Sequence, residues 1–157
     1  MKPLFLLASL LFSAVFSLHS HAQLIASDAS VRAMPPGQPN TAAFLSLSNT
    51  GGRDIRLVSA ATSVSKKAEY HSHTKDDKGV MRMAKEAFVE IKAGETFVFK
   101  TGGHHIMIMG LKKALKPGEN VDMVLTDSNG TEYSFTFPVV SIMAKQPSQD
   151  HSHHHHH

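Results

Sequence analysis

Histidine and methionine side chains gather in two short stretches of this 157-residue chain, which contains twelve histidines, eight methionines and no cysteine. The first stretch runs from Glu69 to Met83 (EYHSHTKDDKGVMRM) and the second from Gly102 to Met109 (GGHHIMIM). Imidazole nitrogen and thioether sulfur both ligate metal ions. The two stretches together therefore predict a metal site.

The softness of these donors indicates which metal would bind. Thioether sulfur is a poor ligand for calcium, magnesium and zinc, whereas copper(I) accepts thioether and imidazole together. Zinc sites draw instead on thiolate, imidazole and carboxylate. A blue-copper electron-transfer site needs a cysteine thiolate, which this chain lacks. We therefore expect a copper(I) site.

Strands alone can bring these donors together. Side chains alternate faces along a strand, so His105 and Met107 share one face while His104 and the two isoleucines after His105 take the other. If the isoleucines face the core, His105 and Met107 point away from it. By the same parity, shared faces are expected for His71 with His73 and for Met81 with Met83.

Each methionine also has a purely structural interpretation, because methionine on a strand most often fills gaps in a core. Met123 alternates with Val121 and Leu125, and we expect it in the core. Met81 and Met109 fit either interpretation, and we favour the structural one. Two separate groups of histidine plus methionine, each flanked by glycine, favour a metal site for the remaining donors.

The elements that position the donors are short strands. Apolar runs bounded by turn residues recur at 43–47, 55–58, 88–91, 97–99, 106–109, 121–125 and 133–139. Ser128-Asn129-Gly130 predicts a hairpin between the last two runs, and Ala93-Gly94 predicts a second one. Many short strands without helical periodicity predict an all-β fold, an antiparallel sandwich or barrel.

The two ends of the chain have the composition of separate segments. Lys2, the apolar run 4–18 and small residues at 20 and 22 predict a signal peptide over residues 1–22 and export to the periplasm. Residues 23–142 then form the binding domain, and residues 143–157 a flexible, histidine-rich tail. We expect no membrane anchor, because the apolar run is short for a membrane span and no cysteine can carry a lipid.

Charge and motif content exclude other classes of protein. The formal net charge of +3 is too small and too evenly spread for a nucleic-acid-binding protein. No Ser-His-Asp order, close carboxylate pair or phosphate-cradling loop stands out, so we do not expect an enzyme. We expect a monomer.

Longer strings of the sequence resemble the periplasmic copper chaperone family called PCuAC. The resembling strings are Met34–Gly37, Thr41–Gly51, Ala68–His71, Gly79–Met83 and Gly102–Leu111. The resemblance covers most of the domain and includes the family's metal motif of a His, a Met and a His-x-Met. Twenty-one residues separate Met83 from His105, as in that motif.

The resemblance implies that His71, Met83, His105 and Met107 ligate the metal. Eleven residues lie between His71 and Met83, one more than in the motif, and an extra residue in the loop 76–78 accounts for this. Whether His73 replaces His71 stays open at this point. His104 stands where the family commonly has Tyr, and its strand parity makes it a poor ligand.

The resemblance also implies a Greek-key β-sandwich of cupredoxin-like or Ig-like type that holds copper(I) near its surface. Such a protein would deliver the ion to the copper centre of cytochrome c oxidase, with an oxidase subunit or another copper chaperone as partner. The histidine tail could add copper(II) binding. Two alternatives are a periplasmic zinc, nickel or copper(II) buffer that uses the tail, and a structural β-sandwich without metal.

Overall fold

A computed structural model describes residues 24–141 of the chain as ten β-strands without a helix. The strands are β1 (Leu24–Arg32), β2 (Asn40–Asn49), β3 (Ile55–Thr62), β4 (Ser65–Lys75), β5 (Met81–Lys85), β6 (Val89–Ile91), β7 (Thr96–Phe99), β8 (His105–Leu111), β9 (Asn120–Asp127) and β10 (Glu132–Val140). No helix in this range is long and apolar enough to cross a membrane. The expected signal peptide, the histidine tail and both domain boundaries lie outside these residues.

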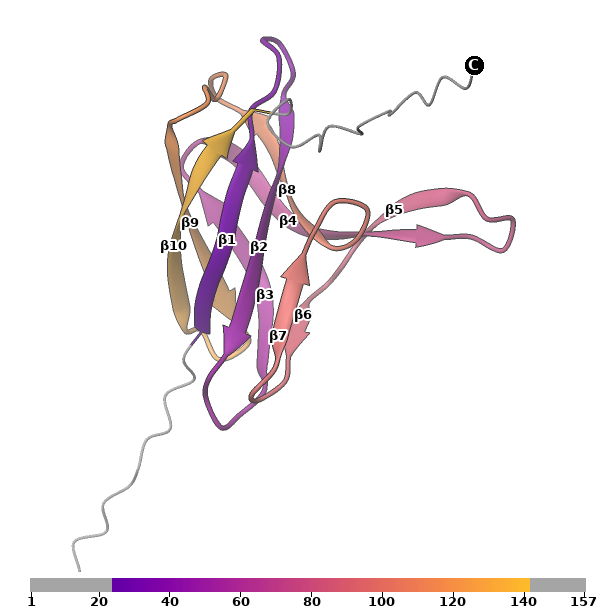
Figure 1. Ribbon diagram of the computed structural model, residues 1–157, viewed down its shortest axis with the longest axis vertical. Coiled ribbons are helices and arrows are strands. Elements are labelled where there is room, and N and C mark those ends of the chain that lie inside the picture. Colours follow the sequence, from indigo (N-terminus) through magenta and orange to yellow (C-terminus); the bar gives the residue numbers. More distant parts are fainter. Residues whose placement is uncertain (1–23, 142–157) are drawn as a thin grey trace, which may run out of the picture.

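The strands form a closed barrel-like sandwich (Figure 1). Hydrogen-bonded neighbours follow the order β5-β4-β8-β2-β1-β10-β9-β3-β6, and an additional pairing between β3 and β4 closes the ring. β5 therefore lies outside the ring with β4 as its partner, and the hairpin of β4 and β5 projects from the body (Figure 1). The all-β sandwich expected from the sequence is confirmed.

Alternation along the strands fills the core. Leu45, Ile106, Met123 and Phe137 come from four different strands and are each at most 1% exposed. In the hairpin of β9 and β10, Met123 lies opposite Phe135 in the ladder. The expected core position of Met123 and the hairpin at 128–130 are both confirmed.

Two details differ from the sequence prediction. Ala93-Gly94 closes no hairpin, because β6 pairs with β3 whereas β7 pairs with β2. Asn49, at the end of β2, holds this crossover: its side chain donates to the Ile91 carbonyl, and its backbone bonds Glu95 and Gly94. The sheet is also not wholly antiparallel, since β1 and β10 run parallel.

Candidate metal centre

The ladder between β4 and β8 places two of the predicted ligands directly opposite each other. His71 pairs with His105, and the next pair inward joins Tyr70 to Ile106. Tyr70 and Ile106 are buried in the core, at 2% and 0% exposure. Because side chains alternate along a strand, His71 and His105 lie on the face that points away from the core.

Both methionines of the predicted set lie on this same face. Met107 follows His105 by two residues on β8 and pairs with Glu69 of β4. Met83 of β5 pairs with His73, which follows His71 by two residues. Three neighbouring strands thus present the predicted donors from one side of the sheet, with Met83 at the outer strand and 48% exposed.

His105 is the centre of an imidazole cluster. Its ring centroid lies 5.8 Å from that of His71 and 5.1 Å from that of His73. The Phe44 ring packs 6.5 Å away, and His105 itself is only 3% exposed. Burial lowers the pKa of His105, and the neighbouring histidines and Arg32 act in the same direction, so the imidazole is neutral at neutral pH.

Hydrogen bonds to one carbonyl determine which ring nitrogens are free to bind a metal. Nδ1 of His105 and Nδ1 of His73 lie 3.2 Å and 3.4 Å from the Gly103 carbonyl oxygen. A carbonyl oxygen only accepts, so each Nδ1 carries a proton, and in the neutral imidazole Nε2 keeps the lone pair.

His71 has the opposite arrangement. Its Nε2 lies 3.1 Å from Oε2 of Glu69, while its Nδ1 is buried and has no hydrogen-bond partner within the described residues. A buried nitrogen without a partner is costly in a folded protein. A metal ion at Nδ1 would satisfy it.

The donor set, rather than histidine alone, limits which metal fits. Among residues 24–141, no group of three or more His, Cys, Asp or Glu side chains is arranged to hold a metal ion. The methionines on this face add thioether sulfur to the imidazoles, and that donor suits a soft ion such as copper(I).

His104 and Met81 lie away from the centre of this face. His104 lies against the Phe97 ring, 5.0 Å between centroids, as expected for the opposite face. Met81 pairs with Lys75, two residues nearer the tip of the β4–β5 hairpin than the pair of His73 and Met83, and it is 48% exposed. Met81 is therefore not the core residue that the structural interpretation favoured.

Glu69 and Phe44 are parts of the site that the sequence did not assign. Lys67, Lys85 and His71 all approach the Glu69 carboxylate, and they lower its pKa to about 2. Strand parity could have identified Glu69, because a residue two positions before His71 on the same strand shares its face. Phe44 gave no comparable signal, because its place beside His105 depends on the pairing of β2 with β8.

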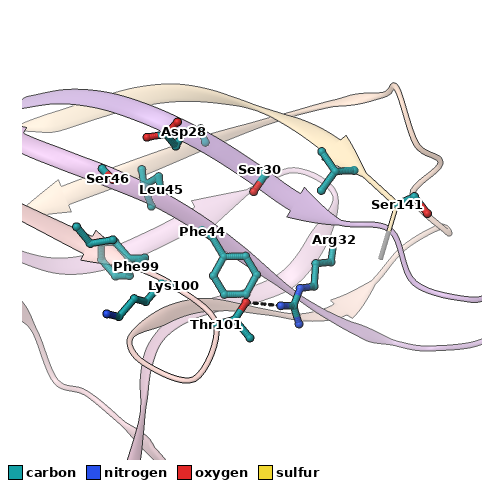
Figure 2. A pocket seen from close by; sticks show the side chains of 13 residues that line it. Asp28, Ser30, Arg32, Phe44, Leu45, Ser46, Phe99, Lys100, Thr101 and Ser141 are labelled. Atoms are coloured by element: carbon teal, nitrogen blue, oxygen red, sulfur yellow. Dashed lines mark hydrogen bonds between the residues drawn. The ribbon is translucent and has the colours of Figure 1, made fainter. Parts of the chain in front are cut away.

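A groove of about 870 Å³ adjoins this site through Phe44. Figure 2 shows the Arg32 guanidinium beside the Phe44 ring, where it donates a hydrogen bond to the Thr101 hydroxyl. The cation lies 4.7 Å from the ring centroid, within the range of a cation–π contact. Phe44 thus contacts both the Arg32 cation and the His105 ring.

Comparison with known proteins agrees with this architecture. A family described as "Putative lipoprotein LpqE-like" matches residues 24–139. A protein of Leifsonia xyli subsp. xyli (strain CTCB07), described as "Putative lipoprotein Lxx21020", is 37% identical over 104 residues, which are 66% of this chain and 62% of the relative. The chain thus spans less than two thirds of that relative's length.

Solved structures with the same fold are PCuAC domains. The "Copper-bound PCuAC domain from PmoF2" superposes with a TM-score of 0.63 at 15% identity, covering 75% of this chain and 92% of that domain. The copper(I) form of DR1885 from Deinococcus radiodurans gives a TM-score of 0.63 at 30% identity, covering 83% of this chain and 87% of that one. The chain therefore belongs to the LpqE-like family, which is of PCuAC type.

Proposed function

We propose that this protein is a copper carrier that binds one copper(I) ion through His71, Met83, His105 and Met107. The observation that carries the proposal is the direct pairing of His71 with His105 across β4 and β8, with both methionines on the same face. In its neutral form each imidazole offers one unprotonated nitrogen, and the thioethers are neutral, so the set matches a soft monovalent cation.

Accessibility supports a carrier rather than a structural metal site. Met83 is 48% exposed and lies on a strand that pairs with β4. A structural sandwich that used its methionines as core filler would bury them, as it does Met123 at 0% exposure. The copper-bound PCuAC domain from PmoF2 and the copper(I) form of DR1885 support the same assignment.

The cellular role follows from the family and from the chemistry of transfer. The lipoprotein descriptions of the family and of the relative support a location in the cell envelope, which we assign to the periplasm. There the protein would deliver copper(I) to the copper centre of cytochrome c oxidase, directly or through another chaperone. It is a carrier and not an enzyme, because its four protein ligands leave no position for a substrate.

Anaerobic copper(I) competition against a chromogenic chelator tests the proposal. Substitutions of residues that only support metal ligands typically lower metal affinity ~10–100-fold. The double variant Met83→Leu, Met107→Leu removes two ligands, so its copper(I) affinity should fall by more than this. Met81→Leu is the matched control, since it lies on the same strand with the same 48% exposure as Met83, and it should bind like the unmodified protein.

X-ray absorption should then show sulfur and nitrogen around copper in the unmodified protein and no sulfur in the double variant. Circular dichroism checks that the variant keeps its fold. Equal affinities in the double variant and in Met81→Leu would refute the assignment.

His71 and His73 require separate substitutions, because both imidazoles lie beside His105. We assign the ligand role to His71, whose Nδ1 is buried and unpaired. His71→Asn should therefore cost more copper(I) affinity than His73→Asn. The reverse order would make His73 the ligand.

The histidine tail would add capacity for copper(II), because a run of neutral imidazoles suits this harder ion. The five consecutive histidines at 153–157 lie outside the described residues. Removing residues 151–157 should lower the number of copper(II) ions bound and leave the copper(I) site intact. An unchanged copper(II) stoichiometry would remove the tail from the proposal.

A further inference from the structure

The Glu69 carboxylate joins the two strands that supply the outer half of the candidate metal centre. Its Oε1 lies 2.6 Å from Nζ of Lys67 and 2.7 Å from Nζ of Lys85. Lys67 belongs to the same strand, β4, whereas Lys85 belongs to β5 and pairs with His71 in the ladder. Two cations therefore contact one carboxylate oxygen, and the Glu69 side chain is only 10% exposed.

The second oxygen is thereby directed at His71. Oε2 lies 3.1 Å from Nε2 of that imidazole. Lys67 and Lys85 both pair with this carboxylate, and the oxygens of an ionised carboxylate can only accept hydrogen bonds. In the neutral imidazole, Nε2 of His71 then carries the proton and donates to Glu69, and the lone pair lies on the buried Nδ1, which has no partner in the described structure.

We infer that Glu69 is a positioning residue that fixes the His71 tautomer so that Nδ1, not Nε2, binds copper. A carboxylate that accepts from the far nitrogen of a metal-bound imidazole orients the ring and strengthens it as a donor. This inference rests on the proposed function for its copper, but the tautomer it assigns belongs to the metal-free protein. The other two imidazoles of the cluster bond to the Gly103 carbonyl instead, so this device is specific to His71 within the described site.

The same contact also restrains Met83. Lys85 follows Met83 by two residues on β5, and its bond to Glu69 attaches the base of the projecting hairpin to the face that carries His71 and Met107. Loss of the carboxylate would therefore loosen one imidazole ligand and one thioether ligand together.

Three full-length variants test the inference. Glu69→Ala removes the acceptor, whereas Glu69→Gln keeps an acceptor oxygen without the charge. The control is Glu90→Ala, because Glu90 also pairs with two cations, Arg56 and Lys92, but lies on β6 away from the site. Copper(I) affinity should fall about 10–100-fold in Glu69→Ala. It should fall less in Glu69→Gln and stay unchanged in Glu90→Ala.

A metal-free measurement separates this inference from the proposed function. Long-range proton–nitrogen NMR correlations report which nitrogen of each neutral imidazole is protonated, and His71→Asn identifies the His71 signals. The unmodified protein and Glu69→Gln should show His71 protonated at Nε2, and Glu69→Ala should show a mixture of both tautomers.

Protonation at Nδ1 in the unmodified protein would overturn the inference, as would equal copper(I) affinities for Glu69→Ala and Glu90→Ala. If the unmodified protein bound no copper(I), the proposed function would fail, while the NMR result would still decide the tautomer. If Glu69→Ala failed to fold, the spectrum of the unmodified protein and the Glu69→Gln affinity would still decide it.

Discussion

The barrel closes between β3 and β4 through a short ladder, whose register contains the single pair Ala60 and Ala68. Tyr70 reinforces this closure, because its hydroxyl donates to the Ser59 carbonyl at 2.8 Å while its ring is buried at 2% exposure. Burial raises the pKa of Tyr70, so the hydroxyl stays protonated and remains a donor at every relevant pH. Tyr70→Phe removes this bond and leaves the ring in place.

The expected cost is that of one hydrogen bond without a cavity. A typical intramolecular hydrogen bond contributes about 0.5–1.5 kcal/mol net, and a carbonyl left buried without a partner costs about 1–3 kcal/mol. The bond to Ser59 is only partly buried, so the cost should lie near the middle of the first range, about 1 kcal/mol. For a domain of this size, that corresponds to a fall in Tm of roughly 3–6 °C.

Urea denaturation measures the total cost, and native-state hydrogen exchange measures where it falls. Tyr133→Phe is the control, because it is the other tyrosine of the chain and its hydroxyl bonds Asp127 at 3.3 Å within the β9–β10 hairpin. Tyr70→Phe should speed exchange selectively in β3 and β4, whereas Tyr133→Phe should affect its own hairpin. A Tyr70→Phe variant as stable as the unmodified protein, or one with no preference for β3 and β4, would refute the reasoning.

Three further changes have defined outcomes. Met123→Ala should destabilise the domain by about 2–5 kcal/mol in urea unfolding, because the side chain is fully buried in the core. The metal-free protein should lose stability as the pH falls below about 6.5, because His105 takes up a proton in the unfolded chain at that pH. In the folded protein the pKa of His105 is lowered, so it binds the proton only at lower pH. His105→Gln should therefore flatten this part of a plot of Tm against pH. Gly110→Ala should cost more in Tm than Gly79→Ala, because both glycines have positive φ, +67° and +77°, but a Cβ at Gly110 alone would meet Lys66 at 3.1 Å.

Sequence periodicity predicted the strands whose two faces differ in polarity. β9 and β10 alternate apolar and polar residues, and their pairing followed from the turn at 128–130. β1 was missed, because Ser and Asp interrupt its apolar pattern and a bulge between Ser27 and Ser30, with Asp28 at φ 53°, shifts its register. The false hairpin at 93–94 arose because a turn signal predicts a reversal of the chain and not the partner of the next strand.

The strands that carry the candidate ligands were hard to recognise for a reason connected with their role. β4 and β5 place histidine, methionine and charged residues on the outer face, so neither shows a clean apolar run. Parity alone nevertheless predicted that His105 and Met107 share a face. It could not predict the pairing of His71 with His105 or the part played by Glu69, because both depend on which strands become neighbours.

The turn at the end of the β4–β5 hairpin has a consequence for how such domains are compared. The last ladder pair joins Lys75 to Met81, and residues 76–80 form the connection beyond it. Insertions or deletions there lengthen or shorten only the connection and leave His73 aligned with Met83. A search pattern for related domains should therefore let the interval between the first histidine and the first methionine vary. Whether the two residues pair across the β4–β5 ladder is a better criterion than the number of residues between them.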